Sequence, residues 1–198
     1  MSEKTSEKTK IKLNTPNKLT IFRILLVPVM VIVSFIQFPG DLWGIKTQWI
    51  ILDVLFIIGS LTDHWDGHLA RKNNQITTFG KFLDPIADKI LVISTMIAFI
   101  DMAYISSIAV IIIIIREFLV TSLRLVAASD NLVIAASKLG KLKTVIQMIV
   151  LTVMFFTPQI VNLSGFLPIT ILEWIMVIIT VVSGADYLIK NKHVITTK

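Results

Sequence analysis

The sequence predicts an all-α membrane protein of six transmembrane helices, preceded by a short amphipathic helix on the membrane surface. Two features of composition favour this class. Hydrophobic residues make up 55% of the chain and charged residues only 16%, whereas soluble domains average about 45–50% apolar and about 25% charged. A third feature is the recurrence of apolar stretches near the ~20 residues that a helix needs to cross a bilayer. The 198 residues are enough for one compact bundle of such spans.

The beginning of the chain is polar, and ordered structure is expected to begin near Thr15. Residues 1–12 contain the block Ser-Glu-Lys-Thr twice, so we interpret them as a disordered tail. Thr15 can cap a helix, and Pro16 suits the first helical position. Because Lys18 and Arg23 flank this start, the short surface helix is expected here, before the chain enters the bilayer.

Six apolar stretches follow, and each is expected to form one span. A signal peptide is disfavoured for the first stretch, because it is long for such a segment and lacks an A-x-A cleavage site. The tightest link is expected near Asp101, between the third and fourth stretches. The expected spans are Ile21–Phe38, Trp49–Ala70, Phe82–Met102, Tyr104–Ala127, Val145–Val161 and Leu167–Ile189.

Basic residues are distributed asymmetrically over the connections. The N-terminal segment, the second and fourth connections and the C-terminus carry most of them, whereas the opposite side has only Lys46. Cytoplasmic loops are enriched in Lys and Arg, so both termini are expected in the cytoplasm. The net charge of +6, combined with the hydrophobicity, predicts membrane lipid rather than nucleic acid as the partner. The chain has no cysteine, which excludes disulfides and thiolate metal sites.

Four aspartates, Asp63, Asp66, Asp84 and Asp88, fall at or inside the second and third spans. A charge at the centre of a spanning helix costs ~2.5–3.5 kcal/mol, so these carboxylates need partners. They are spaced i,i+3 and i,i+4, and each pair therefore shares one helical face. Two divalent cations would balance the four charges, and carboxylate oxygens suit Mg²⁺ or Mn²⁺. An ion-pair network that only holds helices together is the alternative.

The aspartates belong to a longer pattern, Asp63-x2-Asp66-Gly67-x2-Ala70-Arg71-x8-Gly80-x3-Asp84-x3-Asp88. This pattern resembles the signature of the CDP-alcohol phosphotransferase family at every fixed position. The resemblance implies a six-span homodimer in the bacterial cytoplasmic membrane, with an active site that faces the cytoplasm. It also implies transfer of a phosphatidyl group from CDP-diacylglycerol to an alcohol, with release of CMP.

The resemblance further implies roles for the matching residues. Two divalent ions per site would be bound by Asp63, Asp66 and Asp84, with Asp88 joining the second ion and acting as the general base. Residues 13–198 would form a single six-helix membrane catalytic domain. The residues expected to bind CDP-diacylglycerol are Gly67, Ala70, Arg71, Gly80, Asn17 and Thr20.

A second group of charged residues predicts the kind of acceptor. Arg116 follows a run of isoleucines, Arg124 lies eight residues further on, and Lys141 and Lys143 begin the fifth helix. Together they would form a basic pocket beside the aspartates, which suits a phosphate monoester. Anchoring of the cytoplasmic side remains the alternative for Lys138 and Lys143. Glu117 is expected to pair with Arg124 or to orient it.

These basic segments, together with residues 16–23 and Ser183-Gly184-x-Asp186-Tyr187, resemble the branch of the family that uses glycerol 3-phosphate as its acceptor. The alternatives within the family are the branches that make cardiolipin, phosphatidylserine or phosphatidylinositol phosphate. Outside the family, a cation transporter would also place acids within spans. Transporters often contain internal repeats, and the acid pattern of the second and third spans does not recur later in this chain.

Overall fold

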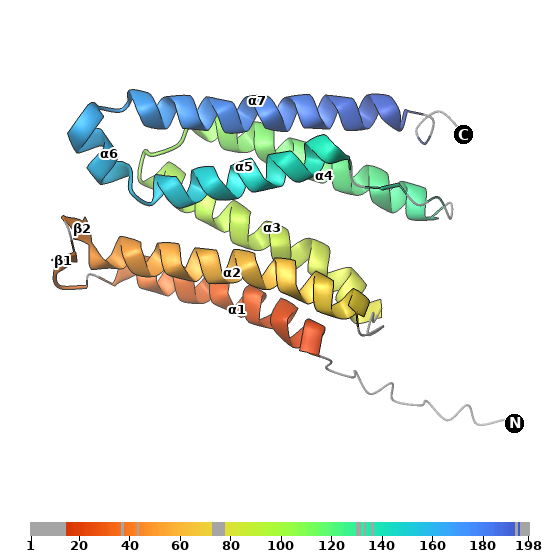
Figure 1. Cartoon of the computed structure of the whole chain (residues 1–198), viewed down its shortest axis with the longest axis horizontal. Coiled ribbons are helices and arrows are strands. Elements are labelled where there is room, and N and C mark those ends of the chain that lie inside the picture. The colour runs from red at the N-terminus through yellow and green to blue at the C-terminus, as the bar shows by residue number, and fades with distance from the viewer. Residues whose placement is uncertain are drawn as a thin grey trace, which may run out of the picture.

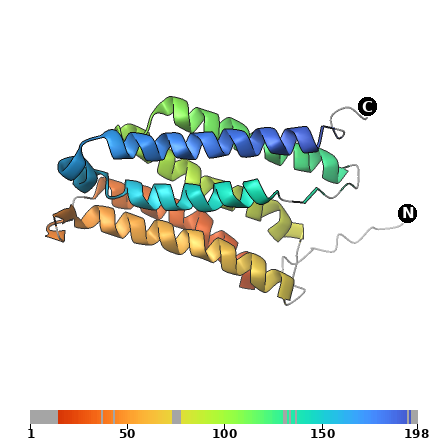
Figure 2. The ribbon, with the colours of Figure 1, turned by 45° about the horizontal axis from the view of Figure 1, so that its top comes forward.

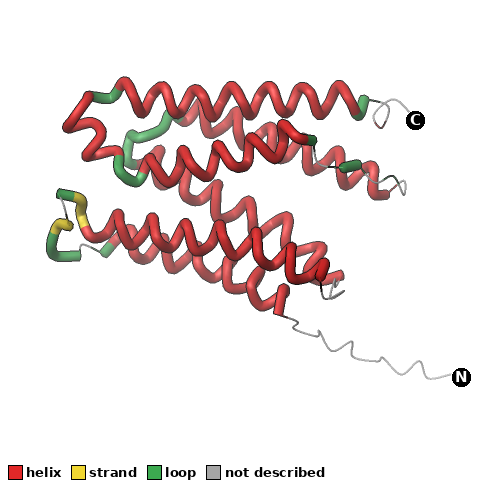
Figure 3. The backbone as a smooth tube through the Cα atoms, in the orientation of Figure 1, coloured by secondary structure: helices red, strands yellow, loops and turns green. Residues whose placement is uncertain are grey.

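The computed structural model describes residues 15–36, 38–42, 44–72, 78–129, 132, 134–135, 137–192 and 194. For residues 15, 16, 63–72, 78–82, 84, 85 and 88 it describes the helical backbone but not the side chains. The expected tail, residues 1–12, lies outside the described residues. Within them the regular secondary structure is helical apart from one small hairpin, which confirms the predicted all-α class (Figures 1 and 3). The elements are α1 Thr15–Phe35, β1 Asp41–Leu42, β2 Ile45–Lys46, α2 Thr47–Lys72, α3 Thr78–Asp101, α4 Ser107–Ser129, α5 Lys138–Met154, α6 Thr157–Ser164 and α7 Leu167–Lys190.

The long helices lie side by side in two groups of three (Figure 1). In one group α1 packs against α2 and α3, and in the other α7 packs against α4 and α5. Contacts of α3 with α4 and of α2 with α5 join the two groups. Aromatic side chains fill the space where they meet: the rings of Phe99 and Phe155 pack edge to face with centroids 4.8 Å apart. Phe56 lies against the same Phe155 ring.

The first helix differs from the prediction, because α1 is one helix from Thr15 to Phe35 rather than a surface helix followed by a span. The expectation of a separate surface helix is therefore wrong. Three polar residues in the first turns of this helix, Asn17, Thr20 and Arg23, are buried, and α1 packs against α2 and α3. Arg23, with no exposed area, donates a hydrogen bond from Nε to the Gly59 carbonyl at 3.2 Å. A charged residue near the start of α1 thus has its hydrogen-bond partner on α2.

The predicted fifth span is divided into α5 and α6, whose axes differ by 73°. Ser137 caps the start of α5 by accepting a hydrogen bond from the Gly140 amide at 2.9 Å. Pro158 lies in the first turn of α6, where its missing N–H needs no helical partner. The short α6 therefore begins a new direction, near the β1–β2 hairpin at the end of the bundle (Figure 3).

Several helices have the apolar character of membrane spans. Among the described residues, α1 and α7 are long and apolar enough to cross a membrane, and α5 with α6 makes a third span if the bent pair is counted as one. Their outer faces carry exposed apolar side chains, such as Leu25 and Ile178. These apolar helices indicate a helical membrane protein, and the count of six spans stays a prediction. In α4, charged residues near the middle lower its apolar character.

Candidate functional site

The aspartate motif lies on the paired ends of α2 and α3. Asp63 and Asp66 occupy about the last three turns of α2, whereas Asp84 and Asp88 occupy about the first three turns of α3. The two helices pack together, and these ends lie at the same end of the bundle (Figure 2). The side chains of the predicted metal ligands lie outside the described residues. The side chains of Ala70 and Arg71, which are predicted to bind the donor, are also outside the described residues. Gly67 and Gly80, predicted for the same role, lie in the same ends of α2 and α3.

Polar residues of α1 are buried at this end as well. Asn17 is 2% exposed and Thr20 is 1% exposed, and both were predicted to bind the donor. Arg23 reaches the carbonyl of Gly59, which lies one turn before Asp63 on α2. Burial of an arginine is costly unless it is paired, so its place beside the aspartate-bearing end of α2 favours a site built around charge.

A buried ion-pair cluster lies on the adjoining helices. Oε1 of Glu117 accepts a hydrogen bond from Nη1 of Arg116 at 3.0 Å and another from Nζ of Lys143 on α5. These side chains are only 19%, 12% and 4% exposed, respectively. The prediction that Glu117 pairs with Arg124 is wrong. One carboxylate between two buried cations offsets part of the cost of removing both from water.

The last helix, α7, forms one wall of this cluster. The hydroxyl of Ser183 accepts a hydrogen bond from Nη2 of Arg116 at 2.5 Å. Further along α4, Nε of Arg124 donates to the hydroxyl of Tyr187 at 3.1 Å, and the guanidinium carbon lies 5.4 Å from the centroid of the same ring. Ser183 and Tyr187 belong to the segment that resembles the glycerol 3-phosphate branch, but no role was predicted for either residue. The pattern that could have indicated them is a small and an aromatic residue four positions apart near the end of an apolar helix.

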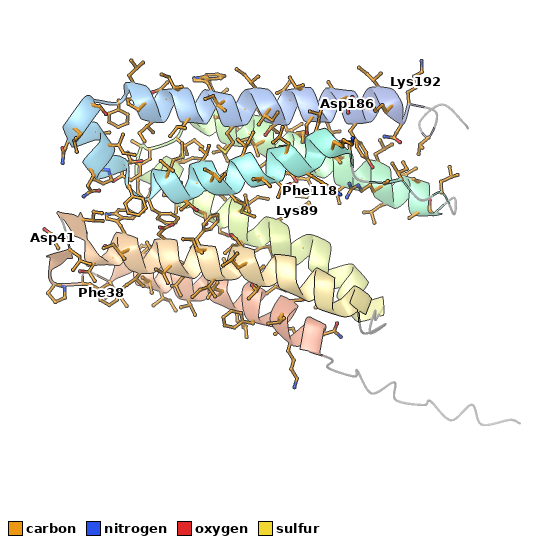
Figure 4. The ribbon with its side chains drawn as sticks, viewed as in Figure 1. Phe38, Asp41, Lys89, Phe118, Asp186 and Lys192 are labelled. Carbon is orange, nitrogen blue, oxygen red and sulfur yellow. The ribbon has the colours of Figure 1, made fainter. Side chains whose placement is uncertain are left out.

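Lys89 connects the cluster to the aspartate-bearing helix. It directly follows Asp88 in α3, and it lies close enough to Glu117 and Lys143 to interact with both electrostatically. Figure 4 shows Lys89 near the middle of the bundle, away from the Phe38 and Asp41 end. The structure thus brings Glu117 of α4 and Lys143 of α5 near the helix that carries Asp84 and Asp88.

The four predicted cations of the basic pocket are held to different degrees. Lys143 is buried, Arg116 is partly buried, and both contact Glu117, whereas Arg124 and Lys141 are exposed. In the part of the chain that the structure describes, Nε of Arg116 is buried without a hydrogen-bond partner. Because this Nε is buried, an anion would reach the guanidinium through the second N–H groups of Nη1 and Nη2.

Two other acidic residues lie apart from this cluster. Asp186 of α7 forms an ion pair with Lys190, with 2.6 Å between Oδ1 and Nζ. Asp53, in the first half of α2, is 6% exposed. Over the described residues no group of three or more acidic or histidine side chains could hold a metal. The aspartate motif, whose side chains lie outside them, therefore remains the predicted metal site.

Comparison with known proteins extends these observations. The family model described as CDP-alcohol phosphatidyltransferase matches residues 13–185. A Bacillus subtilis protein named CDP-diacylglycerol–glycerol-3-phosphate 3-phosphatidyltransferase is 41% identical over 192 residues, which cover 93% of this chain and 98% of that protein. Proteins of the same name from Rickettsia bellii and Haemophilus influenzae are 36% and 34% identical; each match covers 90% of this chain, and 95% and 93% of those proteins.

Proposed function

Because the chain belongs to the CDP-alcohol phosphatidyltransferase family, we propose that it transfers the phosphatidyl group of CDP-diacylglycerol to glycerol 3-phosphate. The products are phosphatidylglycerophosphate and CMP. The observation that carries the choice of acceptor is the buried cluster of Arg116, Glu117 and Lys143 beside α3. With Arg124 its net charge is positive, and a phosphate monoester, with about −1.5 to −2 charges at neutral pH, complements it.

The donor is proposed to bind at the aspartate motif through two divalent metal ions, Mg²⁺ or Mn²⁺. The aspartate ligands fit these ions, because four carboxylates on two packed helices supply hard oxygen atoms and balance the charge of two divalent cations. When bound, the ions would polarise phosphoryl oxygens and offset the charge that builds up on them. The ligands would be Asp63, Asp66, Asp84 and Asp88, and contacts to the cytidine diphosphate and its lipid would come from Asn17, Thr20, Gly67, Ala70, Arg71 and Gly80.

The proposed reaction is a displacement at phosphorus. The hydroxyl oxygen of glycerol 3-phosphate attacks the phosphorus that carries diacylglycerol. A new P–O bond forms, and the P–O bond to CMP breaks so that CMP leaves with the bonding electrons. The carboxylate of Asp88 accepts the proton of the attacking hydroxyl. Arg116, Arg124, Lys141 and Lys143 hold the phosphate of the acceptor, so the protein contributes mainly position and charge.

The placement of the protein is part of the same proposal. Residues 13–198 form one catalytic domain with six spans, which assembles as a homodimer in the bacterial cytoplasmic membrane. The active site faces the cytoplasm, where nucleotide-linked and phosphorylated substrates are found. The apolar helices and the concentration of Lys and Arg on one side of the predicted spans support this placement.

An acceptor panel tests the proposal directly. Purified protein in detergent micelles with CDP-diacylglycerol should release CMP when glycerol 3-phosphate is added. It should release none above background with serine, inositol 1-phosphate or phosphatidylglycerol. The Asp88→Asn variant is the matched control for contaminating activity. Turnover with one of the other acceptors, and none with glycerol 3-phosphate, would assign the enzyme to a different branch of the family.

A further inference from the structure

We propose that α7, which carries no residue of the aspartate motif, sets the affinity for the acceptor by positioning Arg116 and Arg124 through the hydroxyl groups of Ser183 and Tyr187. The inference rests on the proposed function, because it assigns positioning residues to the same acceptor site. Ser183 and Tyr187 do not touch the reacting atoms. They act through the two arginines.

The pairing follows from the spacing on two packed helices. Ser183 and Tyr187 are four residues apart on α7, so they lie one turn apart on one face. Arg116 and Arg124 are eight residues apart on α4 and share a face in the same way. Since α4 and α7 pack together, each arginine meets one hydroxyl, at 2.5 Å for Arg116 and 3.1 Å for Arg124. Both hydroxyl-bearing residues are buried, at 0% and 2% exposed, so the wall that they form is fixed by packing.

Gly184 makes room for the first of these contacts. A Cβ atom at this position would lie 2.8 Å from Cγ of Arg116 and 3.5 Å from its Nε. Glycine inside a helix is less stable than alanine by about 1 kcal/mol, so its presence in α7 needs a reason. The close approach of the Arg116 stem supplies that reason. Any larger residue would push the guanidinium away from Ser183.

Each guanidinium keeps N–H groups that these contacts do not use. In Arg116, Nη1 donates to Glu117 and Nη2 to Ser183, and each of these nitrogens keeps a second N–H that an anion can accept from. In Arg124, the ring of Tyr187 covers one side and its hydroxyl binds Nε. The Nη groups of Arg124 then remain for a two-point contact with a phosphate. The contacts with Ser183 and Tyr187 therefore fix the orientation of the arginine N–H groups, which a flexible arginine side chain alone would not keep.

Loss of this wall should change acceptor affinity rather than chemistry. The phosphate of glycerol 3-phosphate is separated from the hydroxyl that reacts, so its contacts act equally in the ground state and the transition state. Weakening such contacts raises KM and leaves kcat nearly unchanged. A residue that only stabilised the fold would instead reduce the amount of active enzyme and lower activity at every concentration of both substrates.

The test compares Ser183→Ala and Tyr187→Phe with wild-type enzyme in detergent micelles. Each variant loses one hydrogen bond, so KM for glycerol 3-phosphate should rise roughly 2- to 12-fold. KM for CDP-diacylglycerol should stay unchanged, and kcat should stay within about twofold of wild type. Ser183→Thr keeps a hydroxyl and should restore most of the affinity. Gly184→Ala should raise the same KM without removing any hydrogen-bonding group.

Two matched control variants are available. Tyr104→Phe removes the hydroxyl of the other tyrosine, whose ring packs on Trp49 and Phe99 in the other half of the molecule. Ser129→Ala removes a hydroxyl that, among the described residues, donates to the Val126 carbonyl of its own helix. Both should keep wild-type KM values. Unchanged KM for glycerol 3-phosphate in Ser183→Ala and Tyr187→Phe would overturn the inference, as would equal losses for both substrates. If wild-type enzyme releases no CMP with glycerol 3-phosphate, the proposed function itself fails.

Discussion

Glu117 is the residue on which the burial of two cations depends. Its carboxylate contacts both Arg116 and Lys143, and Lys143 is 3% exposed. A buried cation without its anion is far less stable than one in a pair. The same carboxylate lowers the positive charge of the cluster, so that an acceptor phosphate meets a moderate rather than an extreme field. The Glu117 side chain therefore both positions Arg116 and Lys143 and balances part of their positive charge.

Glu117→Gln should lower stability, because two buried cations lose their anion. The expected loss is about 3–5 kcal/mol for breaking a buried pair from one side. Thermal unfolding in detergent measures it. The double variant Glu117→Gln with Lys143→Met should recover part of the loss, because one uncompensated charge is also removed. A double variant that is no more stable than the single one would show that Lys143 is not the partner that matters.

At the scale of single residues, we predict that metal-dependent activity requires each aspartate carboxylate of the motif. Asp63→Asn, Asp66→Asn and Asp84→Asn should each abolish turnover, because each removes a charged ligand from a site that needs four to balance two divalent ions. Excess chelator should abolish the activity of the wild-type enzyme, and added Mg²⁺ or Mn²⁺ should restore it. CMP release is the measurement. Full activity in excess chelator is incompatible with the proposed metal site.

The acceptor cations are predicted to differ in importance. Arg124 is anchored by Tyr187, whereas Lys141 is exposed at the start of α5. Loss of a charge-assisted contact costs about 1.5–3 kcal/mol, which is roughly 10- to 150-fold in efficiency. Arg124→Ala should therefore raise KM for glycerol 3-phosphate by this factor, and Lys141→Ala should raise it less. If both variants lose CDP-diacylglycerol affinity instead, the cations bind the phosphates of the donor.

At the scale of elements, apolar length predicted where helices lie better than how they begin and turn. The stretch expected at Leu167–Ile189 is α7, Leu167–Lys190, because a long apolar run with a proline in its first turn has one helical solution. The stretch expected at Val145–Val161 divides at Phe155, since apolarity alone does not show the turn before Pro158. The prediction for the start of α1 was wrong because Asn17, Thr20 and Arg23 are buried in the bundle, where Arg23 bonds to the Gly59 carbonyl of α2.

The site shows the same division between local and tertiary information. The aspartates were found from sequence, because their i,i+3 and i,i+4 spacing and unusual cost in apolar segments are local properties. The partners of Glu117 were not, because Lys143 is on another helix and its contact depends on how α4 and α5 pack. The partner of Arg124, Tyr187, lies on α7 and could not be assigned from spacing along one helix.

The close packing of α1, α2 and α3 gives an element-scale prediction at Gly59. A Cβ atom there would lie 2.7 Å from Cδ2 of Leu91 and 2.9 Å from Cδ2 of Leu26. Gly59→Val should therefore overpack this contact and cost about 1–3 kcal/mol, or a fall in melting temperature of about 2–12 °C. Thermal unfolding in detergent measures the shift. Val54→Leu, on an exposed position of the same helix, is the control and should unfold as wild type does.

At the scale of the whole molecule, the elements of the proposed site lie at one end of the bundle, and the β1–β2 hairpin and α6 lie at the other. The first turns of α1, the paired ends of α2 and α3, and the Ser183–Tyr187 face of α7 belong to one end of the bundle (Figures 1 and 2). The hairpin and α6 belong to the other, where the Nε2 group of Gln159 donates to the Gly44 carbonyl. Figure 4 shows Phe38 and Asp41 at that end, far from Asp186. A chain arranged in this way can expose one end to each side of a membrane.

The orientation of the two ends is the prediction for the whole molecule. Lys and Arg gather near the aspartate end, and cytoplasmic loops are enriched in these residues, so that end should face the cytoplasm. The chain has no cysteine, and each introduced cysteine is therefore the single site of labelling. In intact cells a membrane-impermeant maleimide should label Lys46→Cys, on the exposed hairpin, and should label Asn73→Cys only after permeabilisation. Wild-type protein, which cannot react, gives the blank. The reverse pattern would place the aspartate motif outside the cell, away from any nucleotide-linked donor, and would contradict both the topology and the proposed reaction.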